Sequence, residues 1–316
     1  MSAGRNAGAA RLAILCPGQG GQHAGMFDLF RGDARAAGIF EGSQLEAILG
    51  YPLATVLNDD RLLFANRPAQ VLVVAAALAA WEVLRDALPQ PALVAGYSIG
   101  ELAAYGVAGS LPVGDTLAIA ARRADAMDVC AKNAPQGLMS VSGLEIKRAH
   151  ALLQEHGAHV AIETGFDTLI AGGGRAALLA SEPALLAGGA RIGWLPVSVA
   201  SHTPLMQGAL DSFAQALAEA RLSDPLVPVL AGISGKPIRD AKTAKEALSR
   251  QLSDTIHWSA CMDACAESGI TVALELGPGA ALSGMLRARH PSIACRSLAD
   301  FRSLQGVLGW LERELA

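Results

Sequence analysis

The sequence has few aromatic residues and few charged ones. Of its 316 residues, 4% are aromatic and 17% are charged, whereas 52% are apolar. The formal net charge is −4, and acidic and basic residues are interspersed without a basic stripe. We therefore expect no nucleic acid partner, and a small anionic ligand would have to be bound by a local arginine. A chain of this length and apolarity can bury a large core, as one big domain or a big domain with a smaller companion.

Long hydrophobic runs are also absent. The longest, VLVVAAALAAW at residues 71–81, has 11 residues and is too short to cross a bilayer, so we interpret it as part of a buried helix. The N-terminal MSAGRNAGAA lacks the apolar segment of a signal peptide. These two absences predict a cytoplasmic protein without a membrane partner.

The five cysteines lack the spacing of a metal site or of a Cys-x-x-Cys motif. Cys261 and Cys265 lie one helical turn apart, and we interpret them as packed thiols. An odd number of cysteines without a pairing framework is typical of a reducing compartment. The sequence therefore predicts no metal ligands.

Short apolar strands alternate with helices in both outer parts of the chain. Strands are expected at residues 12–16 and 92–95, in LVPVLAG, and at 271–279. Helices are expected at residues 69–88, in ELAAYGVAGSL, and at 113–131, 204–220, 242–252, 258–267 and 299–315. This alternation predicts an α/β fold with a mostly parallel sheet.

The middle of the chain has a different order of elements. A strand at 137–143 precedes a helix at 145–157, and AHVAIETG and DTLIAGGG follow as two strands. ALLASEPALLAGGA is expected to be a helix that Pro183 could break, and a last strand covers 191–200. The order βαββαβ is that of a ferredoxin-like module. We therefore predict a large unit made of residues 1–135 and 201–316, with a small ferredoxin-like unit at 136–200.

The stretch GYSIGE at residues 96–101 has the Gly-x-Ser-x-Gly pattern of a nucleophile elbow. In such a turn the serine projects above the sheet at the start of the next helix, and the N–H of the following residue, here Ile99, is free to donate to an oxyanion. The alternative is a capping box, in which Ser98 and Glu101 only terminate a helix. The motif alone is weak and does not decide between the two interpretations.

A serine nucleophile needs a base. Among the seven histidines, His202 follows directly on the predicted strand WLPVSVA, where a parallel sheet presents its functional groups. The others lie in polar loops, on a polar helix, or beside Trp258. A lone histidine at a strand end is more often structural or solvated, so this position by itself is only an indication.

Several stretches together resemble one family, the malonyl-CoA:acyl carrier protein transacylases and related acyltransferase domains. They occur in the family's order over roughly residues 11–290. The matching stretches are LCPGQGGQHAGM (15–26), GYSIGELAA (96–104), RADAM (123–127), VSVASHTPLM (197–206), GKPI (235–238), QL (251–252) followed by Trp258, and ELGPGAALSGML (275–286).

The resemblance implies an α/β-hydrolase-like large subdomain with an inserted ferredoxin-like one. It also implies a ping-pong transfer in which Ser98 attacks the thioester of malonyl-CoA and His202 is the general base. The backbone N–H groups of Gln19 and Ile99 would form the oxyanion hole. The main-chain carbonyl of Gln251 would hold His202 by Nδ1, in place of the carboxylate of a catalytic triad.

The resemblance further assigns Arg123 to the free carboxylate of the malonyl group, which a guanidinium can bind with two hydrogen bonds. Its neighbour Arg122 lies on a different face of the helix. The acceptor would be the phosphopantetheine-type thiol of an acyl carrier protein, and malonyl-CoA is expected as a substrate with no permanently bound cofactor.

The sequence departs from the family pattern at four positions. Tyr97 stands before the serine where histidine is usual, and Gly21 replaces the serine of a GQGSQ turn. Ile162 and Thr164 stand where asparagines are common. These departures favour a specialised branch, the epsilon subunit of malonate decarboxylase, over a housekeeping fatty-acid or a polyketide malonyl transacylase.

Two other classes of function compete with acyl transfer. A serine hydrolase would release acids from esters or thioesters, but no Asp or Glu is placed as a triad member and Arg123 would demand an anionic acyl group. A non-catalytic module that docks carrier proteins would not need Ser98, His202 and Arg123 together. Both comparisons favour transfer.

Overall fold

The computed structural model describes residues 10–42 and 44–316. Its larger sheet has six strands in the order β11-β10-β1-β2-β7-β8. All neighbouring strands are parallel except β7 and β8, which are antiparallel. The strands are β1 (Leu12–Cys16), β2 (Leu93–Gly96), β7 (Val229–Leu230), β8 (Pro237–Ile238), β10 (Val272–Glu275) and β11 (Ala294–Ser297). The α/β class with a mostly parallel sheet is thus confirmed.

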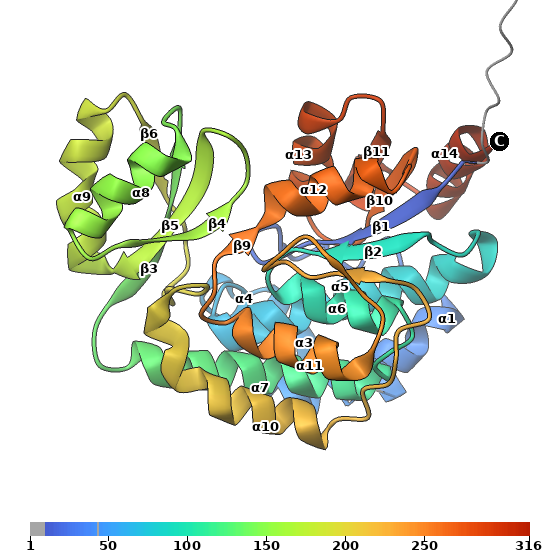
Figure 1. Ribbon diagram of the computed structural model, residues 1–316. Helices are drawn as coiled ribbons and strands as arrows, with labels where there is room; N and C mark the ends of the chain where they lie inside the picture. Colours follow the sequence, from blue (N-terminus) through green and yellow to red (C-terminus); the bar gives the residue numbers. More distant parts are fainter. Residues whose placement is uncertain (1–9, 43) are drawn as a thin grey trace, which may run out of the picture.

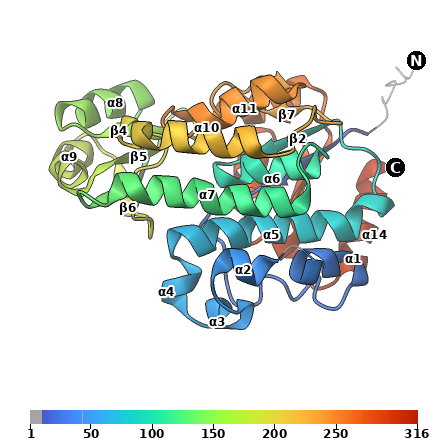
Figure 2. The ribbon, with the colours of Figure 1, turned by 90° about the horizontal axis from the view of Figure 1, so that it is seen from below.

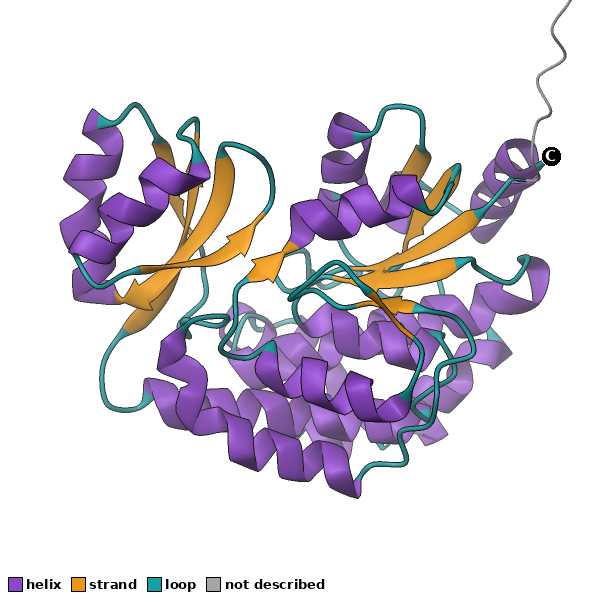
Figure 3. Ribbon diagram, viewed as in Figure 1, coloured by secondary structure: helices purple, strands orange, loops and turns teal. Residues whose placement is uncertain are grey.

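Helices cover both faces of this sheet (Figures 1 and 3). One face carries α5 (Asn66–Leu84), α6 (Ile99–Val107), α7 (Val113–Ala131), α10 (Leu210–Glu219) and α11 (Ala241–Arg250). The other face carries α12 (Trp258–Glu267) and α13 (Ala281–Arg289), and α14 (Leu304–Leu315) lies near the β1 and β11 end. Seen from below, α5 and α7 run side by side above four short helices (Figure 2). These are α1 (Ala34–Ala37), α2 (Leu45–Leu49), α3 (Leu53–Leu57) and α4 (Asp60–Leu63).

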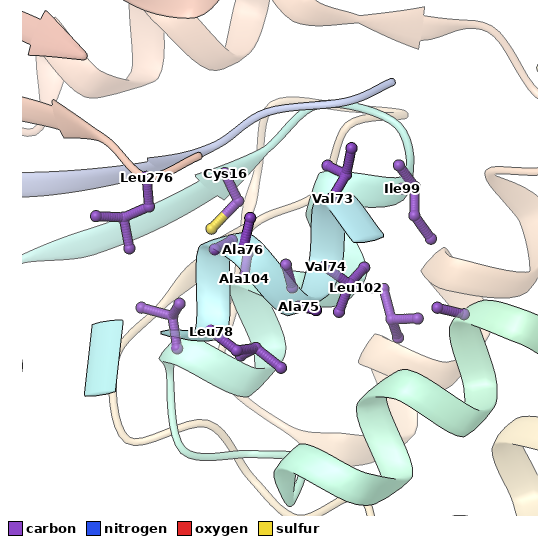
Figure 4. Packing of buried hydrophobic residues seen from close by; sticks show 14 of the residues in the cluster. Cys16, Val73, Val74, Ala75, Ala76, Leu78, Ile99, Leu102, Ala104 and Leu276 are labelled. Atoms are coloured by element: carbon purple, nitrogen blue, oxygen red, sulfur yellow. The ribbon is translucent and has the colours of Figure 1, made fainter. Parts of the chain in front are cut away.

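Helix α5 forms the centre of the main core. Its 19 residues are almost all buried, and the run of alanines around Ala75 and Ala76 allows the neighbouring helices to approach closely. Figure 4 shows these side chains packed with Ile99 and Leu102 of α6 and with Cys16 of β1. Residues Asn66–Ala87 are long and apolar enough to cross a membrane, but 83% of the most apolar window is buried inside the protein. The apolar character of α5 is explained by this core position.

The second sheet has the order β6-β3-β5-β4-β9. Its first four strands are antiparallel to their neighbours, and with two helices they give the predicted order βαββαβ. These elements are β3 (Gln136–Ser142), α8 (Ile146–Glu155), β4 (His159–Glu163), β5 (Thr168–Gly174), α9 (Arg175–Ala187) and β6 (Arg191–Trp194). The fifth strand, β9 (Ile256–His257), comes from a distant part of the chain and pairs in parallel with β4. The boundaries at residues 136 and 200 remain predictions.

Several predicted elements have different limits in the structure. The strand expected at 191–200 ends at Trp194, because Pro196 lacks an N–H and the Val197 N–H bonds back to the carbonyl of Leu195. Helix α9 continues through Pro183 without a break. The helix expected at 204–220 begins as a 3₁₀ turn, Pro204–Ala209. The prediction that His202 follows directly on a strand was therefore wrong.

Candidate active site

The elbow at residues 96–100 is a tight turn between β2 and α6. Ser98 has φ +56° and ψ −120°, a conformation that residues other than glycine rarely adopt. A Cβ on Gly100 would lie 2.1 Å from the carbonyl oxygen of Cys16, and one on Gly96 would lie 2.2 Å from the Glu101 nitrogen. Only glycine fits at these two positions. The strained serine is thus held by packing against the neighbouring strand.

The capping-box interpretation of Ser98 and Glu101 was wrong. Ser98 is the N-cap residue of α6, yet its side chain makes no capping hydrogen bond. Instead, Ser98 Oγ lies 2.7 Å from His202 Nε2. The carboxylate of Glu101 accepts hydrogen bonds from Gly232 and Gln251, not from the N-cap backbone. The serine hydroxyl is therefore directed at the histidine.

His202 is held from its second ring nitrogen and from its backbone. His202 Nδ1 lies 2.6 Å from the main-chain oxygen of Gln251, and its backbone N–H donates to the carbonyl of Leu252 at 2.7 Å. A carbonyl can only accept, so Nδ1 carries the proton and Nε2 is left to accept one from Ser98. Burial lowers the pKa of His202 to about 3, and the charge of Arg123 acts in the same direction. The imidazole is accordingly neutral near neutral pH, in the form that acts as a base.

The two expected oxyanion donors come from two turns, one after β2 and one after β1. Ile99 is the first residue of α6, so its N–H has no partner within the helix. Gln19 lies in the turn after β1 and lines the same cavity as Ser98. The turn itself is braced by Gln22, whose side-chain oxygen accepts from the Gly20 N–H at 2.6 Å. The free N–H of Ile99 directly follows the serine, as an oxyanion hole requires, whereas the Gln19 N–H as the second donor stays a prediction.

Arg123 lies on α7 and is only 2% exposed. Its guanidinium donates to the side-chain oxygens of Gln70, at 2.7 Å, and Gln251, at 3.1 Å. Burial lowers the pKa of Arg123 to about 10, and the nearby Glu101 opposes that effect, so the group stays charged at neutral pH. Arg122 instead forms an exposed ion pair with Glu219, as expected from its different helix face.

A cavity of about 410 Å³ opens at Ser98 between the two sheets. All four positions that depart from the family pattern are in its wall: Gly21, Tyr97, Ile162 and Thr164. Tyr97 also packs edge-on against Trp258, with ring centroids 5.3 Å apart. Tyr97 thus both lines the cavity and packs against Trp258.

Among these departures, Gly21 has a steric explanation. A Cβ on Gly21 would lie 2.4 Å from the carbonyl oxygen of Pro278 and 3.1 Å from Cα of Gly279. Both atoms belong to the backbone of the Gly-Pro-Gly turn after β10, which cannot move aside without shifting the cavity wall. A serine at this position would not fit here, so the glycine follows from the close approach of the two turns.

The structure adds residues that the sequence analysis did not assign. Gln70 supports Arg123, and its signal was an amide next to the apolar run of α5. The buried carboxylate of Glu275, at the end of β10, accepts from the N–H groups of Leu282 and Ser283 at the start of α13. Among the described residues, no cluster of three or more His, Cys, Asp or Glu side chains is placed to hold a metal ion.

Comparisons with known proteins match the chain over nearly its whole length. A family model described as "Acyl transferase domain" matches residues 14–305. The malonyl CoA-acyl carrier protein transacylase of Mycobacterium tuberculosis is 32% identical over 304 residues, covering 94% of this chain and all of the relative.

Two solved structures extend this comparison. The malonyl CoA-acyl carrier protein transacylase from Coxiella burnetii superposes with a TM-score of 0.90 at 24% identity, over 98% of this chain and 99% of that one, which establishes the fold. A malonyl-transacylase solved in complex with its type II PKS acyl-carrier protein gives a TM-score of 0.89 at 25% identity, over 96% of this chain and 100% of that one.

Proposed function

The chain belongs to the acyl transferase domain family, and from that premise we propose that it moves a malonyl group from malonyl-CoA to the phosphopantetheine thiol of an acyl carrier protein. Relatives with the same fold carry the name of this reaction. The observation that supports it most directly is the buried cluster in which Gln251 contacts both the histidine of the Ser98–His202 pair and Arg123.

In the first half-reaction, Ser98 Oγ attacks the thioester carbonyl carbon of malonyl-CoA. His202 Nε2 takes the hydroxyl proton, and the N–H groups of Gln19 and Ile99 stabilise the oxygen that becomes negative. The C–S bond then breaks, and the CoA sulfur leaves with the proton from His202. The products are a malonyl ester on Ser98 and free CoA.

In the second half-reaction, the phosphopantetheine thiol of the acyl carrier protein takes the place of CoA. His202 removes the thiol proton, the sulfur attacks the ester carbonyl, and the same two N–H groups stabilise the second oxyanion. The C–O bond to Ser98 breaks, and Ser98 recovers its proton from His202. The proposed reaction requires no resident cofactor.

The neutral partner of His202 favours transfer over hydrolysis. In a catalytic triad a carboxylate stabilises the imidazolium that forms in each step. Here the partner is the main-chain oxygen of Gln251, and the positive Arg123 lowers the pKa of His202 further. A thiol ionises far more readily than water, so in the second half-reaction a weakened base slows the attack of water more than the attack of a thiol.

The pathway is the finer part of the proposal. The departures from the family pattern favoured a malonate decarboxylase epsilon subunit, but the curated relatives are named malonyl CoA-acyl carrier protein transacylases. They support the alternative better, so we propose an acyl carrier protein of fatty-acid or polyketide synthesis as the acceptor. A cytoplasmic location belongs to the same proposal.

The test follows the acyl group. The protein is incubated with malonyl-CoA, its intact mass is measured, and a phosphopantetheinylated acyl carrier protein is added. The proposal expects a malonyl adduct that is absent in Ser98→Ala and that moves to the carrier. Free malonate without carrier product would indicate a hydrolase, and no adduct would indicate a docking module. Faster loading of the malonate decarboxylase carrier subunit would restore the first pathway.

A further inference from the structure

Glu101 is a buried carboxylate that the proposed reaction leaves unused. It lies in the first turn of α6, three residues after Ser98, and has no solvent exposure. One of its oxygens, Oε2, accepts from the Gly232 N–H at 2.9 Å and from Gln251 Nε2 at 2.6 Å. A buried carboxylate is costly unless hydrogen bonds compensate it, so its place beside the nucleophile calls for a role.

Gln251 connects Glu101 to the rest of the site. Its side-chain nitrogen donates to Glu101 and, at 3.2 Å, to the Ser98 carbonyl. Its side-chain oxygen accepts from Arg123. Its main-chain oxygen accepts from His202. One residue therefore contacts the nucleophile's backbone, the base and the carboxylate-binding arginine.

The direction of the Gln251 amide is decided by its partners. An amide offers a donor at one end and an acceptor at the other, and the two ends have nearly the same shape. Glu101 Oε2 also accepts from the Gly232 N–H, so it is an acceptor whether or not the other oxygen carries a proton, and a guanidinium only donates. The nitrogen of Gln251 must therefore face Glu101 and its oxygen must face Arg123. If the carboxylate became an amide, it could present either end to Gln251.

We propose that Glu101 is a positioning residue that fixes the Gln251 side-chain amide and through it orients Arg123 toward the anionic acyl group. Gln70 and Gln251 each occupy one of the five N–H groups of the guanidinium, which leaves three for a substrate carboxylate. The inference rests on the proposed function, because Arg123 acts on the acyl group only in that reaction.

The first test is a double-mutant cycle on acyl selectivity. The ratio of kcat/KM for malonyl-CoA to that for acetyl-CoA is measured with carrier protein in wild type, Glu101→Gln, Arg123→Ala and the double variant. Glu101→Gln should lower the ratio about tenfold in the wild-type background and leave it unchanged in the Arg123→Ala background. Glu219→Gln, which removes an exposed partner of Arg122, is the control and should leave the ratio unchanged.

An equal fall of the ratio in both backgrounds would show that Glu101 merely supports the fold, and an unchanged ratio in Glu101→Gln would also overturn the proposal.

A second double-mutant cycle needs no substrate. Urea unfolding of Glu101→Gln, Gln251→Ala and the double variant should give non-additive losses of stability, whereas additive losses would refute the link between the two side chains. This cycle separates a failure of the positioning role from a failure of malonyl transfer itself.

Discussion

Glu101 and His202 should shift stability with pH in opposite directions, so that their effects cancel in wild type and appear in the single variants. Burial raises the pKa of Glu101 from 4.5 to about 7. Burial and Arg123 lower the pKa of His202 from 6.5 to about 3. Both groups are fully buried, so solvent screening is small. For each group, the pH range that matters lies between its unfolded and its folded pKa. These two ranges overlap between pH 4.5 and 6.5.

The sign of each contribution follows from which state binds the proton. In the overlap the folded protein keeps a proton on Glu101 that the unfolded chain has lost, so this group makes stability fall as pH rises. The unfolded chain protonates His202 while the folded protein does not, so this group makes stability rise. Each slope approaches about 1.4 kcal/mol per pH unit and falls to about half of that where the pH equals the group's unfolded pKa, so each group changes the stability by about 2 kcal/mol between pH 4.5 and 6.5.

The assay is urea denaturation at half-unit intervals from pH 4.5 to 6.5. Relative to wild type, the free energy of unfolding of Glu101→Gln should gain about 1.4 kcal/mol per pH unit and that of His202→Gln should lose as much. The double variant should return to the wild-type slope. Other carboxylates contribute equally to all four proteins. Parallel curves for wild type and Glu101→Gln would show that Glu101 is already ionised at pH 4.5 and refute the reasoning.

Three further predictions concern the site. Arg123→Ala should lower kcat/KM for malonyl-CoA about 100-fold or more, since two buried charge-assisted hydrogen bonds are lost, while acetyl-CoA turnover changes far less; Arg122→Ala is the matched control, and an unchanged malonyl/acetyl ratio would contradict the clamp. Ser98→Ala should show no malonyl adduct by intact mass, and an adduct at another residue would exclude Ser98 as the nucleophile. Gly21→Ser should cost about 1–3 kcal/mol by urea unfolding because its Cβ meets the Pro278 carbonyl; wild-type stability would mean that the turn moves.

The candidate site residues were predictable where a local sequence pattern identifies them. Ser98 sits in a turn that only small neighbours allow, and such a turn leaves a recognisable spacing of glycines. Arg123 was proposed from its distance to a methionine in a stretch that resembles the family, and its role stays a prediction. His202 was found for a partly wrong reason, since the predicted strand ends eight residues before it. Its position is instead fixed by the carbonyls of Gln251 and Leu252, about fifty residues later.

The remaining features depend on contacts that no local pattern encodes. Gln70 and Glu101 gain their roles from partners more than fifty and more than a hundred residues away in sequence. The same holds for β9, which is too short to have a signature of its own. Regular α/β alternation and the βαββαβ order were predictable because hydrophobic periodicity records which face of each element is buried.

Strand β9 also limits how this protein can be rebuilt. Residues 136–200 look like a cassette that could be exchanged between relatives to change acyl selectivity. However, Val160 of β4 accepts a hydrogen bond from Thr255, the residue before β9, and Glu163 pairs with His257 of β9. A graft that ends at residue 200 would leave one edge of the new sheet without its fifth strand and would disturb the loop in which the Gln251 carbonyl holds His202. A chimera should therefore exchange residues 255–257 together with the insert.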